Sequence, residues 1–398
     1  MIGAGITGLC AARALAKRGA NVAVLEAQTI GWGASSRNGG MVLTGLKLGA
    51  RTLIARYDRD LARQLFKASL AAVDSVEQLV NAERIDCHFN RCGHLALASK
   101  PAHYQHFESA ARVLSQEFEH EVQPVPRAEL RREIGSDNFY GGLLDAASAS
   151  INPGQYVAGL ARAARAAGAT LYEMTPVERI ERHGVRRRVM TASGMVEAAE
   201  ILVATSGYTG AATPGLRRKI VPIGSYIIVT EPLSEALANE LSPRVRMMYD
   251  SRHFLHYFRL TPDRRLLFGG RARFVPETKS TVLQSAAVLR QGMLDVFPQL
   301  REVRVEYAWG GTLDFAFDTM PHAGRMDGYH YALGYAGHGV ALATHLGAQI
   351  GEAIGSGDVH AITFARIPFP GAPLGLYWGQ PWFLPLVAAR YKFLDWVS

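Results

Sequence analysis

Three glycines near the start of the chain have a spacing that suits the binding of a phosphate group. Gly3, Gly5 and Gly8 form a Gly-x-Gly-x-x-Gly sequence directly before an alanine-rich segment with helical periodicity. The first glycine permits a tight turn, the second lets the backbone approach a pyrophosphate, and the third lets a helix pack closely on a strand. The helix N-terminus then presents N–H groups and a positive dipole to the phosphates. The motif predicts a dinucleotide site to which Ile6 and Thr7 also contribute.

An acidic residue follows at the distance that ribose recognition requires. Residues 22–25 form a short apolar run that is typical of a buried parallel strand, and Glu26 ends it. A carboxylate about 20 residues after the glycine loop can bind ribose hydroxyl groups. A glutamate at this point disfavours a 2′-phosphate, so the pattern argues against NADP.

Residues 31–40, Gly-Trp-Gly-Ala-Ser-Ser-Arg-Asn-Gly-Gly, favour FAD over NAD. Plain NAD dehydrogenases usually continue from the acidic residue to another strand and helix. This segment is too rich in glycine to predict a helix, and its small residues and amides suit the ribityl and pyrophosphate groups of a flavin nucleotide. The FAD contacts predicted in this loop are Ala34, Ser35, Ser36, Asn38, Gly39 and Gly40.

At these residues the sequence resembles the D-amino-acid-oxidase-like family of FAD-dependent amine oxidoreductases, and within it the γ-glutamylputrescine oxidase type. The resemblance extends over nearly the whole chain. Its further segments are Pro176-Val177, residues 204–207, Tyr257-Phe258-Arg259, residues 268–271, Trp309-Gly310-Gly311, Asp318 with Pro321, and residues 334–340.

The resemblance implies further cofactor contacts. Val177 lies where the backbone of that family contacts adenine. Ser206 and Gly207 look like its second nucleotide-side turn, and Gly310 belongs to a segment on the flavin side.

Residues 334–340, Gly-Tyr-Ala-Gly-His-Gly-Val, are the most specific of these segments. They open a helix predicted over 340–354, whose N-terminal dipole faces whatever lies before it. The resemblance places the pyrimidine end of the isoalloxazine there, where a positive dipole favours reduced flavin. His338 adds to that field, touches the substrate, or only fixes the loop by hydrogen bonds. The contacts predicted here are Gly334, Gly337, His338, Gly339 and Val340.

Two departures from the family pattern refine the prediction. Covalent flavin attachment in relatives needs a cysteine within 307–321 or a histidine near 31–40; the first histidine here is His88, so we predict dissociable FAD. Amino-acid oxidases of the family place a carboxylate-binding arginine after the Trp-Gly segment, whereas residues 311–314 contain none. This argues for an amine rather than a plain α-amino acid, with Arg259 and Arg271 open as substrate-binding or structural residues.

The resemblance implies an amine oxidation. The amine binds unprotonated, hydride passes from its α-carbon to flavin N5, the imine is released and hydrolysed, and oxygen reoxidises the flavin. Tyr257, Trp309 and His338 are expected to line the reacting face, while His256 faces the opposite side of its sheet because strand residues alternate. Two alternatives remain open. One is a dehydrogenase that passes electrons to a quinone or carrier, and the other is a non-catalytic or defective flavin-fold protein.

Three strand–helix–strand units position these residues; they lie at the start of the chain, near 152–207 and near 328–356. Two strand-rich segments separate the three units. We therefore predict an α/β fold in which a discontinuous Rossmann-like FAD-binding domain carries an inserted, mostly antiparallel α+β substrate domain. The predicted bounds are 1–84, 150–217 and 305–367 for the FAD-binding domain, 85–149 and 218–304 for the substrate domain, and 368–398 for a C-terminal tail.

The segment before the glycine loop departs from the usual dinucleotide-binding pattern. Such a glycine loop normally follows a buried strand of about five residues, yet only Met1 and Ile2 precede Gly3. We expect the strand to be largely missing and FAD to be held more loosely than in a relative with a full strand. This feature also motivates the non-catalytic alternative.

The composition of the chain argues against nucleic-acid, metal and membrane partners. The 398 residues carry a formal net charge of +8, but no nucleic-acid-binding signature accompanies the basic residues, so we expect no nucleic-acid partner. The three cysteines form no disulfide framework or metal motif, which fits a reducing, cytoplasmic location and predicts no metal site. No apolar run reaches about 18 residues. A tail helix within 382–396, with Arg390 and Lys392 on its polar side, is expected to dock on its own domain or a partner subunit rather than on a membrane. The oligomeric state stays open.

Overall fold

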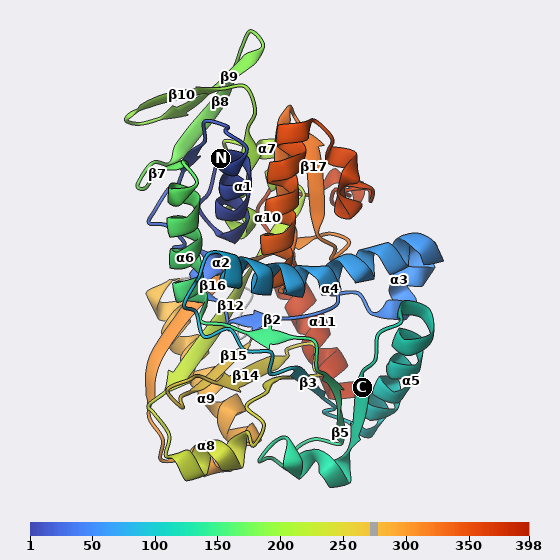
Figure 1. Cartoon of the computed structure of the whole chain (residues 1–398). Helices are drawn as coiled ribbons and strands as arrows, with labels where there is room; N and C mark the ends of the chain where they lie inside the picture. Colours follow the sequence, from blue (N-terminus) through green and yellow to red (C-terminus); the bar gives the residue numbers. More distant parts are fainter. Residues whose placement is uncertain (271–277, 398) are drawn as a thin grey trace.

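A mostly parallel sheet holds the N-terminus of the chain in the upper part of the molecule (Figure 1). The computed structural model describes residues 1–270 and 278–397. Ile2 forms parallel bridges to Leu25 on one side and Val203 on the other, and so joins the two halves of the sheet. The strands on either side of Ile2 are, in spatial order, β7 (Thr170–Tyr172) and β1 (Ala23–Leu25), then β11 (Leu202–Val203), β18 (Tyr329–Leu333) and β17 (His322–Met326).

The segment before the glycine loop is held on both sides. The Ile2 N–H donates to the Leu202 carbonyl and the Gly3 N–H donates to the Leu25 carbonyl, each at 2.9 Å. The glycine loop therefore starts from the middle of the sheet, between two hydrogen-bonded neighbours. The looser binding of FAD stays a prediction.

Four long helices pack beside this sheet, and α1 lies between α6 and α10. Helix α4 begins after Asp58 because the Asp58 carboxylate accepts a hydrogen bond from the Leu61 N–H at 2.9 Å. Its buried face includes Leu65, Val76 and Val80. The four helices are α1 (Ile6–Lys17), α4 (Arg59–Ala82), α6 (Pro153–Ala166) and α10 (Gly339–Ser356).

The expectation that residues 31–40 contain no helix is wrong for their centre. Ala34–Arg37 form a single helical turn, α2. The glycines of the segment lie outside this turn, so the four residues within it have ordinary helix-forming side chains. The Asn38 side-chain amide donates to the carbonyls of Ala34 at 3.0 Å and Ser35 at 2.8 Å, which closes the turn at its C-terminal end.

The lower part of the molecule is built on an eight-stranded sheet (Figure 1). All its neighbouring strands are antiparallel except β13 and β3, which are parallel. In spatial order the strands are β16 (Val305–Ala316), β12 (Ile220–Thr230), β15 (Leu266–Gly270), β14 (His256–Leu260), β13 (Met247–Asp250), β3 (His94–Leu97), β5 (Gly141–Asp145) and β4 (Gln123–Pro126).

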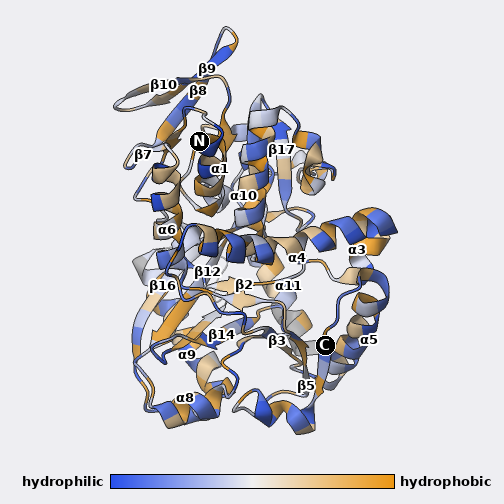
Figure 2. Ribbon diagram, viewed as in Figure 1, coloured by the Kyte–Doolittle hydropathy of each residue, from blue (hydrophilic) through white to orange (hydrophobic). Residues whose placement is uncertain are grey.

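The two faces of this sheet differ. One face packs Tyr226, Phe258 and Phe268 against Leu289 and Met293 of α9 (Lys279–Val296) to form the second core of the molecule. Strand β12 is coloured mainly hydrophobic in Figure 2, and residues on both of its faces are buried. The opposite face is turned toward the upper sheet, and the candidate site lies between the two.

The predicted α/β fold with a mostly antiparallel second unit is confirmed. Residues 305–316, predicted within the FAD-binding domain, pair with β12 from Val305 to Ala316 and so form the edge of the eight-stranded sheet. The exact domain boundaries stay a prediction. The remaining strands and helices are β2 (Met41–Val42), α3 (Ala50–Arg56), α5 (Pro101–Phe118), β6 (Ala149–Ser150), β8 (Val177–His183), β9 (Arg186–Thr191), β10 (Gly194–Ala198), α7 (Pro214–Arg217), α8 (Glu235–Leu241) and α11 (Leu384–Val397).

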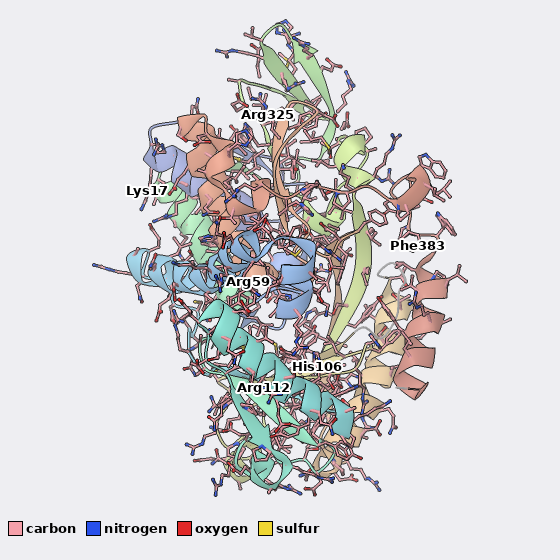
Figure 3. The ribbon with its side chains drawn as sticks, turned by 90° about the vertical axis from the view of Figure 1, so that its right-hand side faces the viewer. Lys17, Arg59, His106, Arg112, Arg325 and Phe383 are labelled. Atoms are coloured by element: carbon pink, nitrogen blue, oxygen red, sulfur yellow. The ribbon has the colours of Figure 1, made fainter. Side chains whose placement is uncertain are left out.

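The C-terminal tail docks on its own chain. Leu384 at the start of α11 packs in a cluster with Val221 of β12 and Phe315 of β16. Phe383 lies at the N-terminal end of α11 (Figure 3), and the rings of His253 and Tyr391 stack with centroids 5.1 Å apart. None of the described helices is long and apolar enough to span a membrane.

Candidate active site

A cavity of about 680 Å³ lies between the upper sheet and the eight-stranded sheet. Its volume falls in the range of small-molecule and cofactor sites. Segments that are far apart in sequence line it: the glycine loop, residues 25–39, residues 203–213, residues 335–340, and single side chains from the large sheet.

The glycine loop has the geometry that its spacing predicts. Gly3 has φ +101°, and a Cβ placed on it would lie 2.7 Å from the Ala204 carbonyl oxygen. A Cβ on Gly8 would overlap the Gly3 carbonyl oxygen, so the close packing that requires this glycine is between α1 and the loop itself. A Cβ on Gly5 would lie 2.7 Å from the Ser35 hydroxyl. The backbone reaches the cavity only because these side chains are absent.

The start of α1 is open to a ligand. Its N-cap residue, Gly5, supplies no side-chain cap, and its first turn contains no acidic residue. The Ile6 N–H donates to the Ser35 hydroxyl at 3.0 Å, which ties α2 to the helix start. Glu26 accepts from the Ala4 N–H at 2.8 Å and from the Gln28 N–H at 3.0 Å. Each Glu26 oxygen thus fixes the backbone of the site and keeps a further lone pair for a hydroxyl donor.

The loop before α10 forms the second open helix start. Asp314 holds it: its carboxylate accepts from the N–H groups of Gly334 at 2.6 Å and Tyr335 at 3.2 Å. Burial raises the pKa of Asp314, and these backbone hydrogen bonds oppose that rise. Gly337 has φ +96°, and a Cβ on it would meet no atom within 4 Å, so it faces open space. No side chain caps α10, which therefore directs its dipole into the cavity.

The two helix starts are linked. The Thr7 hydroxyl and the Tyr335 phenol lie 2.7 Å apart in a buried hydrogen bond. Backbone donors at two uncapped helix starts, a carboxylate beside the first, and glycines that leave room for a ligand are the groups that a dinucleotide with an anionic ring requires. The residues therefore fit FAD.

Most predicted site residues line this cavity. On the nucleotide side they are Gly3, Gly5, Ile6, Thr7, Glu26, Ala34, Ser35, Asn38, Gly39, Val177 and Ser206. On the flavin and substrate side they are Gly337, His338, Gly339, Val340 and Tyr257. Their contacts with bound FAD or substrate stay predictions.

The other predicted residues lie behind the wall of the cavity: Gly8, Ser36, Gly40, Gly207, Gly310, Gly334 and Trp309. Their contacts explain this position. The Ser36 hydroxyl donates to the Gly31 carbonyl at 2.5 Å, and a Cβ on Gly207 would lie 2.8 Å from the Leu313 carbonyl oxygen. These contacts shape the backbone of the wall, and any contact of these residues with FAD stays a prediction.

Trp309 does not line the reacting face on which it was expected. Its indole Nε1 donates to the Arg37 carbonyl at 2.9 Å, so it anchors the end of α2. The ring packs beside Tyr257 in a cluster with Ile227 and Leu267. The polar edge of the tryptophan turns to a backbone carbonyl because this satisfies its only donor.

Tyr257 lies on the cavity side of the large sheet, as predicted. The Tyr257 and Ser225 hydroxyls lie 3.3 Å apart. His256 faces the other side, as predicted: its Nδ1 lies 3.3 Å from the Asp250 carboxylate, and a Cβ on Gly292 of α9 would touch its ring.

The sequence leaves the roles of Arg259 and Arg271 undecided between substrate binding and structure. Arg259 is buried outside the cavity lining and donates to the carbonyls of Gly39 at 2.7 Å and Ile151 at 2.8 Å, so it clamps the end of the 31–40 segment. Burial lowers the pKa of Arg259 to about 10. Its bonds favour the structural role. Arg271 lies outside the described residues.

Sequence reasoning missed several residues of the site, most of which come from the large sheet or follow the 31–40 segment. Tyr249 is the cross-strand partner of Tyr257, and both phenols line the cavity. This pairing was the one signal available, since a tyrosine on an adjacent strand shares the face of its partner. The other missed lining residues include Met41, Leu43, Lys47, Ser225, Leu255, Leu313, Asp314 and Tyr335. Among the described residues no group of three or more potential ligands forms a metal site.

Comparison with known proteins defines the protein family to which the chain belongs. The family model for FAD dependent oxidoreductases (DAO) matches residues 1–353. The chain therefore belongs to this family, and it is an FAD-dependent oxidoreductase.

Individual relatives agree. The chain is 33% identical over 398 residues to the gamma-glutamylputrescine oxidoreductase of Escherichia coli (strain K12), covering 99% of this chain and 92% of the relative. It is 33% identical over 407 residues to the probable oxidoreductase OrdL of Haemophilus influenzae, covering 99% and 91%. The glycine oxidase of Geobacillus kaustophilus shares the fold with a TM-score of 0.76 and 20% identity, over 93% of this chain and 97% of that structure. The resemblance drawn from the sequence is confirmed.

Proposed function

We propose that this enzyme oxidises the C–N bond of an amine of the γ-glutamylputrescine class, with oxygen as the electron acceptor. The observation that carries the proposal is the wall of the cavity that the large sheet supplies. Apart from Asp314 of β16, this wall consists of hydroxyl and apolar side chains, among them Ser225, Tyr249 and Tyr257, with Leu255 just before β14. The described residues of the sheet place no arginine on it, although an arginine there would suit an α-carboxylate. The identity to the E. coli gamma-glutamylputrescine oxidoreductase supports the same substrate class.

Different residues of the chain would bind different parts of FAD. The α1 N-terminus with Gly3 and Gly5 would hold the pyrophosphate, Glu26 a ribose, Val177 the adenine, and the α10 N-terminus the pyrimidine of the flavin. Bound FAD supplies a two-electron acceptor for the hydride of the substrate carbon next to nitrogen.

Orientation and exclusion of water are the remaining tasks. Tyr257 and Tyr249 stand side by side on the sheet and border the space where the amine would bind. Met41, Leu43 and Leu255 add apolar surface that excludes water from the amine. The released imine then hydrolyses to an aldehyde and ammonia in water.

The test uses purified protein reconstituted with FAD. We expect a flavin absorption spectrum, bleaching of that spectrum by γ-glutamylputrescine without oxygen, and hydrogen peroxide when oxygen is admitted. A missing flavin spectrum after reconstitution would refute FAD binding. Bleaching without peroxide, with turnover restored by a quinone, would replace the oxidase by the dehydrogenase. A bound flavin that no amine bleaches would favour a non-catalytic protein.

A further inference from the structure

A row of buried polar side chains leads away from the cavity at Tyr249. The Tyr249 phenol lies 3.3 Å from His94 Nε2, and His94 Nδ1 lies 2.8 Å from the Ser148 hydroxyl. The Ser148 hydroxyl lies 3.2 Å from the Thr44 hydroxyl, which donates to Asp145 at 2.6 Å. The residues beyond Tyr249 are all buried, although polar groups of this kind are normally solvated.

The far end of the row is a fixed negative charge. Burial acts to raise the pKa of Asp145, but the hydrogen bonds from His120 and Thr44 and the nearby His94 outweigh it and lower the pKa to about 2. His120 Nε2 lies 2.7 Å from the same carboxylate oxygen. Asp145 is therefore ionised at neutral pH and can only accept hydrogen bonds.

This charge sets the direction of every hydrogen bond in the row. Thr44 gives its hydroxyl proton to Asp145, so its oxygen accepts from the Ser148 hydroxyl. The Ser148 oxygen also accepts from the Thr44 backbone N–H at 3.0 Å, and its second lone pair accepts from Nδ1–H of His94. The reverse arrangement would leave the Ser148 and Thr44 oxygens 3.2 Å apart with no proton between them.

The same reasoning fixes the state of His94. Burial lowers its pKa, so the ring is neutral, and its proton sits on Nδ1. Nε2 then carries a lone pair that accepts the proton of the Tyr249 phenol. Burial also raises the pKa of Tyr249, so the phenol is protonated at rest.

We propose that Tyr249 and His94 accept the proton that the substrate ammonium group must lose before oxidation. This rests on the proposed amine oxidation. An alkylamine has a pKa near that of lysine, about 10.4, so at neutral pH only about one molecule in a thousand is unprotonated. The N–H bond of the ammonium breaks and an O–H bond forms at Tyr249, while the former phenol proton forms an N–H bond at His94 Nε2. No electrons are transferred in this step. Because burial holds the pKa of His94 below that of the amine, the transfer is uphill; the charge of Asp145 favours the imidazolium, and oxidation of the neutral amine draws the transfer forward.

Tyr249 is the catalytic residue of this row, and His94 and Asp145 act through it as positioning residues. The charged and titratable groups around His94 are Tyr249, Asp145 and His120. Nearby Arg246 donates to the Cys92 carbonyl and pairs with Glu133, so its charge is balanced.

The kinetic test compares the holoenzyme with Tyr249→Phe, which removes only the hydroxyl. With γ-glutamylputrescine and no oxygen, we expect flavin reduction in the variant to slow by roughly 100-fold at neutral pH. The deficit should vanish as the pH approaches the pKa of the amine, because the solution then supplies the neutral amine. Asp145→Asn should show the same pH pattern with a smaller loss. A variant that is equally slow at every pH, or that keeps the wild-type pH profile, would overturn the proposal.

The matched control is Tyr156→Phe. Tyr156 is also a buried phenol, bonded to the Thr344 hydroxyl at 2.9 Å, but it lies outside the cavity lining. We expect its pH profile to equal that of the wild type. A shifted profile in this control would show that the effect of Tyr249→Phe is general and would count against the proposal.

A second readout needs no turnover. ¹⁵N NMR of histidine-labelled protein reports which ring nitrogen carries the proton, and His94→Gln identifies the His94 signals. We expect the proton on Nδ1, with the Nε2 signal shifted in Tyr249→Phe. A proton on Nε2 would overturn the proposal even where the amine-oxidation function holds. Conversely, a wild-type flavin that the amine does not bleach would count against the proposed function alone.

Discussion

The two ends of the cavity recognise their ligands by different means. At the nucleotide end, backbone N–H groups of two uncapped helix starts face the cavity, and glycines keep the backbone accessible. At the reacting end, side chains from separate strands of the large sheet form the wall. Binding at the nucleotide end therefore depends on the shape of the main chain, whereas binding at the reacting end depends on the identity and protonation of single side chains. Changes at one end should therefore leave the function of the other largely intact.

The largest effect is expected at Gly8. In Gly8→Ala the new Cβ would overlap the Gly3 carbonyl oxygen, which no side-chain rearrangement can relieve. We expect a loss of FAD affinity on the order of 100-fold, because overpacking of this kind costs about 3 kcal/mol. Fluorescence titration of the apoprotein with FAD measures it. Gly49→Ala is the control, because a Cβ there meets no atom within 4 Å; equal losses in both variants would break the comparison.

A smaller effect is expected on stability at Asp145. Its pKa is lowered to about 2 from the ordinary value of 3.8, and the carboxylate is nearly fully buried. A depressed pKa adds stability that is present above pH 4 and is lost as the pH falls toward 2, worth about 2 kcal/mol. Chemical unfolding of Asp145→Asn should therefore differ from wild type by this amount at pH 7. The difference should shrink below pH 4, and a difference that is constant with pH would contradict the assignment.

At the reacting end, Tyr257→Phe should lower the rate of flavin reduction about 10-fold, the effect of one lost hydrogen bond to the substrate. FAD affinity should stay within about 2-fold of wild type, because Tyr257 belongs to the sheet and not to the glycine loops. Anaerobic stopped-flow and FAD titration on the same preparation give both numbers. An FAD affinity that falls with the rate would show that the two ends are not separable.

The smallest effect is expected at Gly337. A Cβ there meets open space, so Gly337→Ala suffers only from its φ of +96°, a strain of about 1 kcal/mol. We expect FAD affinity to fall about 5-fold, far less than in Gly8→Ala. An FAD titration that shows equal losses for the two glycines would mean that strain, and not overlap, governs this end of the site.

The same contrast explains how much the sequence could predict. The glycine loop, Glu26 and the 334–340 loop could be placed from local spacing, because each works within one turn and one helix start. The helical turn of α2 was missed because the glycines on either side of it dominate the composition. Trp309 shares the face of Tyr257 but lies outside the cavity lining, because its indole bonds to the Arg37 carbonyl, a contact that the sequence does not show. Tyr249 was missed because its role depends on strand pairing between segments that no local motif connects.

Anaerobic mixing of the FAD-loaded protein with γ-glutamylputrescine tests the central claim most directly. The flavin spectrum should bleach in a single two-electron reduction, with one aldehyde formed per flavin. A protein that binds FAD tightly but keeps its oxidised spectrum with this and other amines would contradict the account.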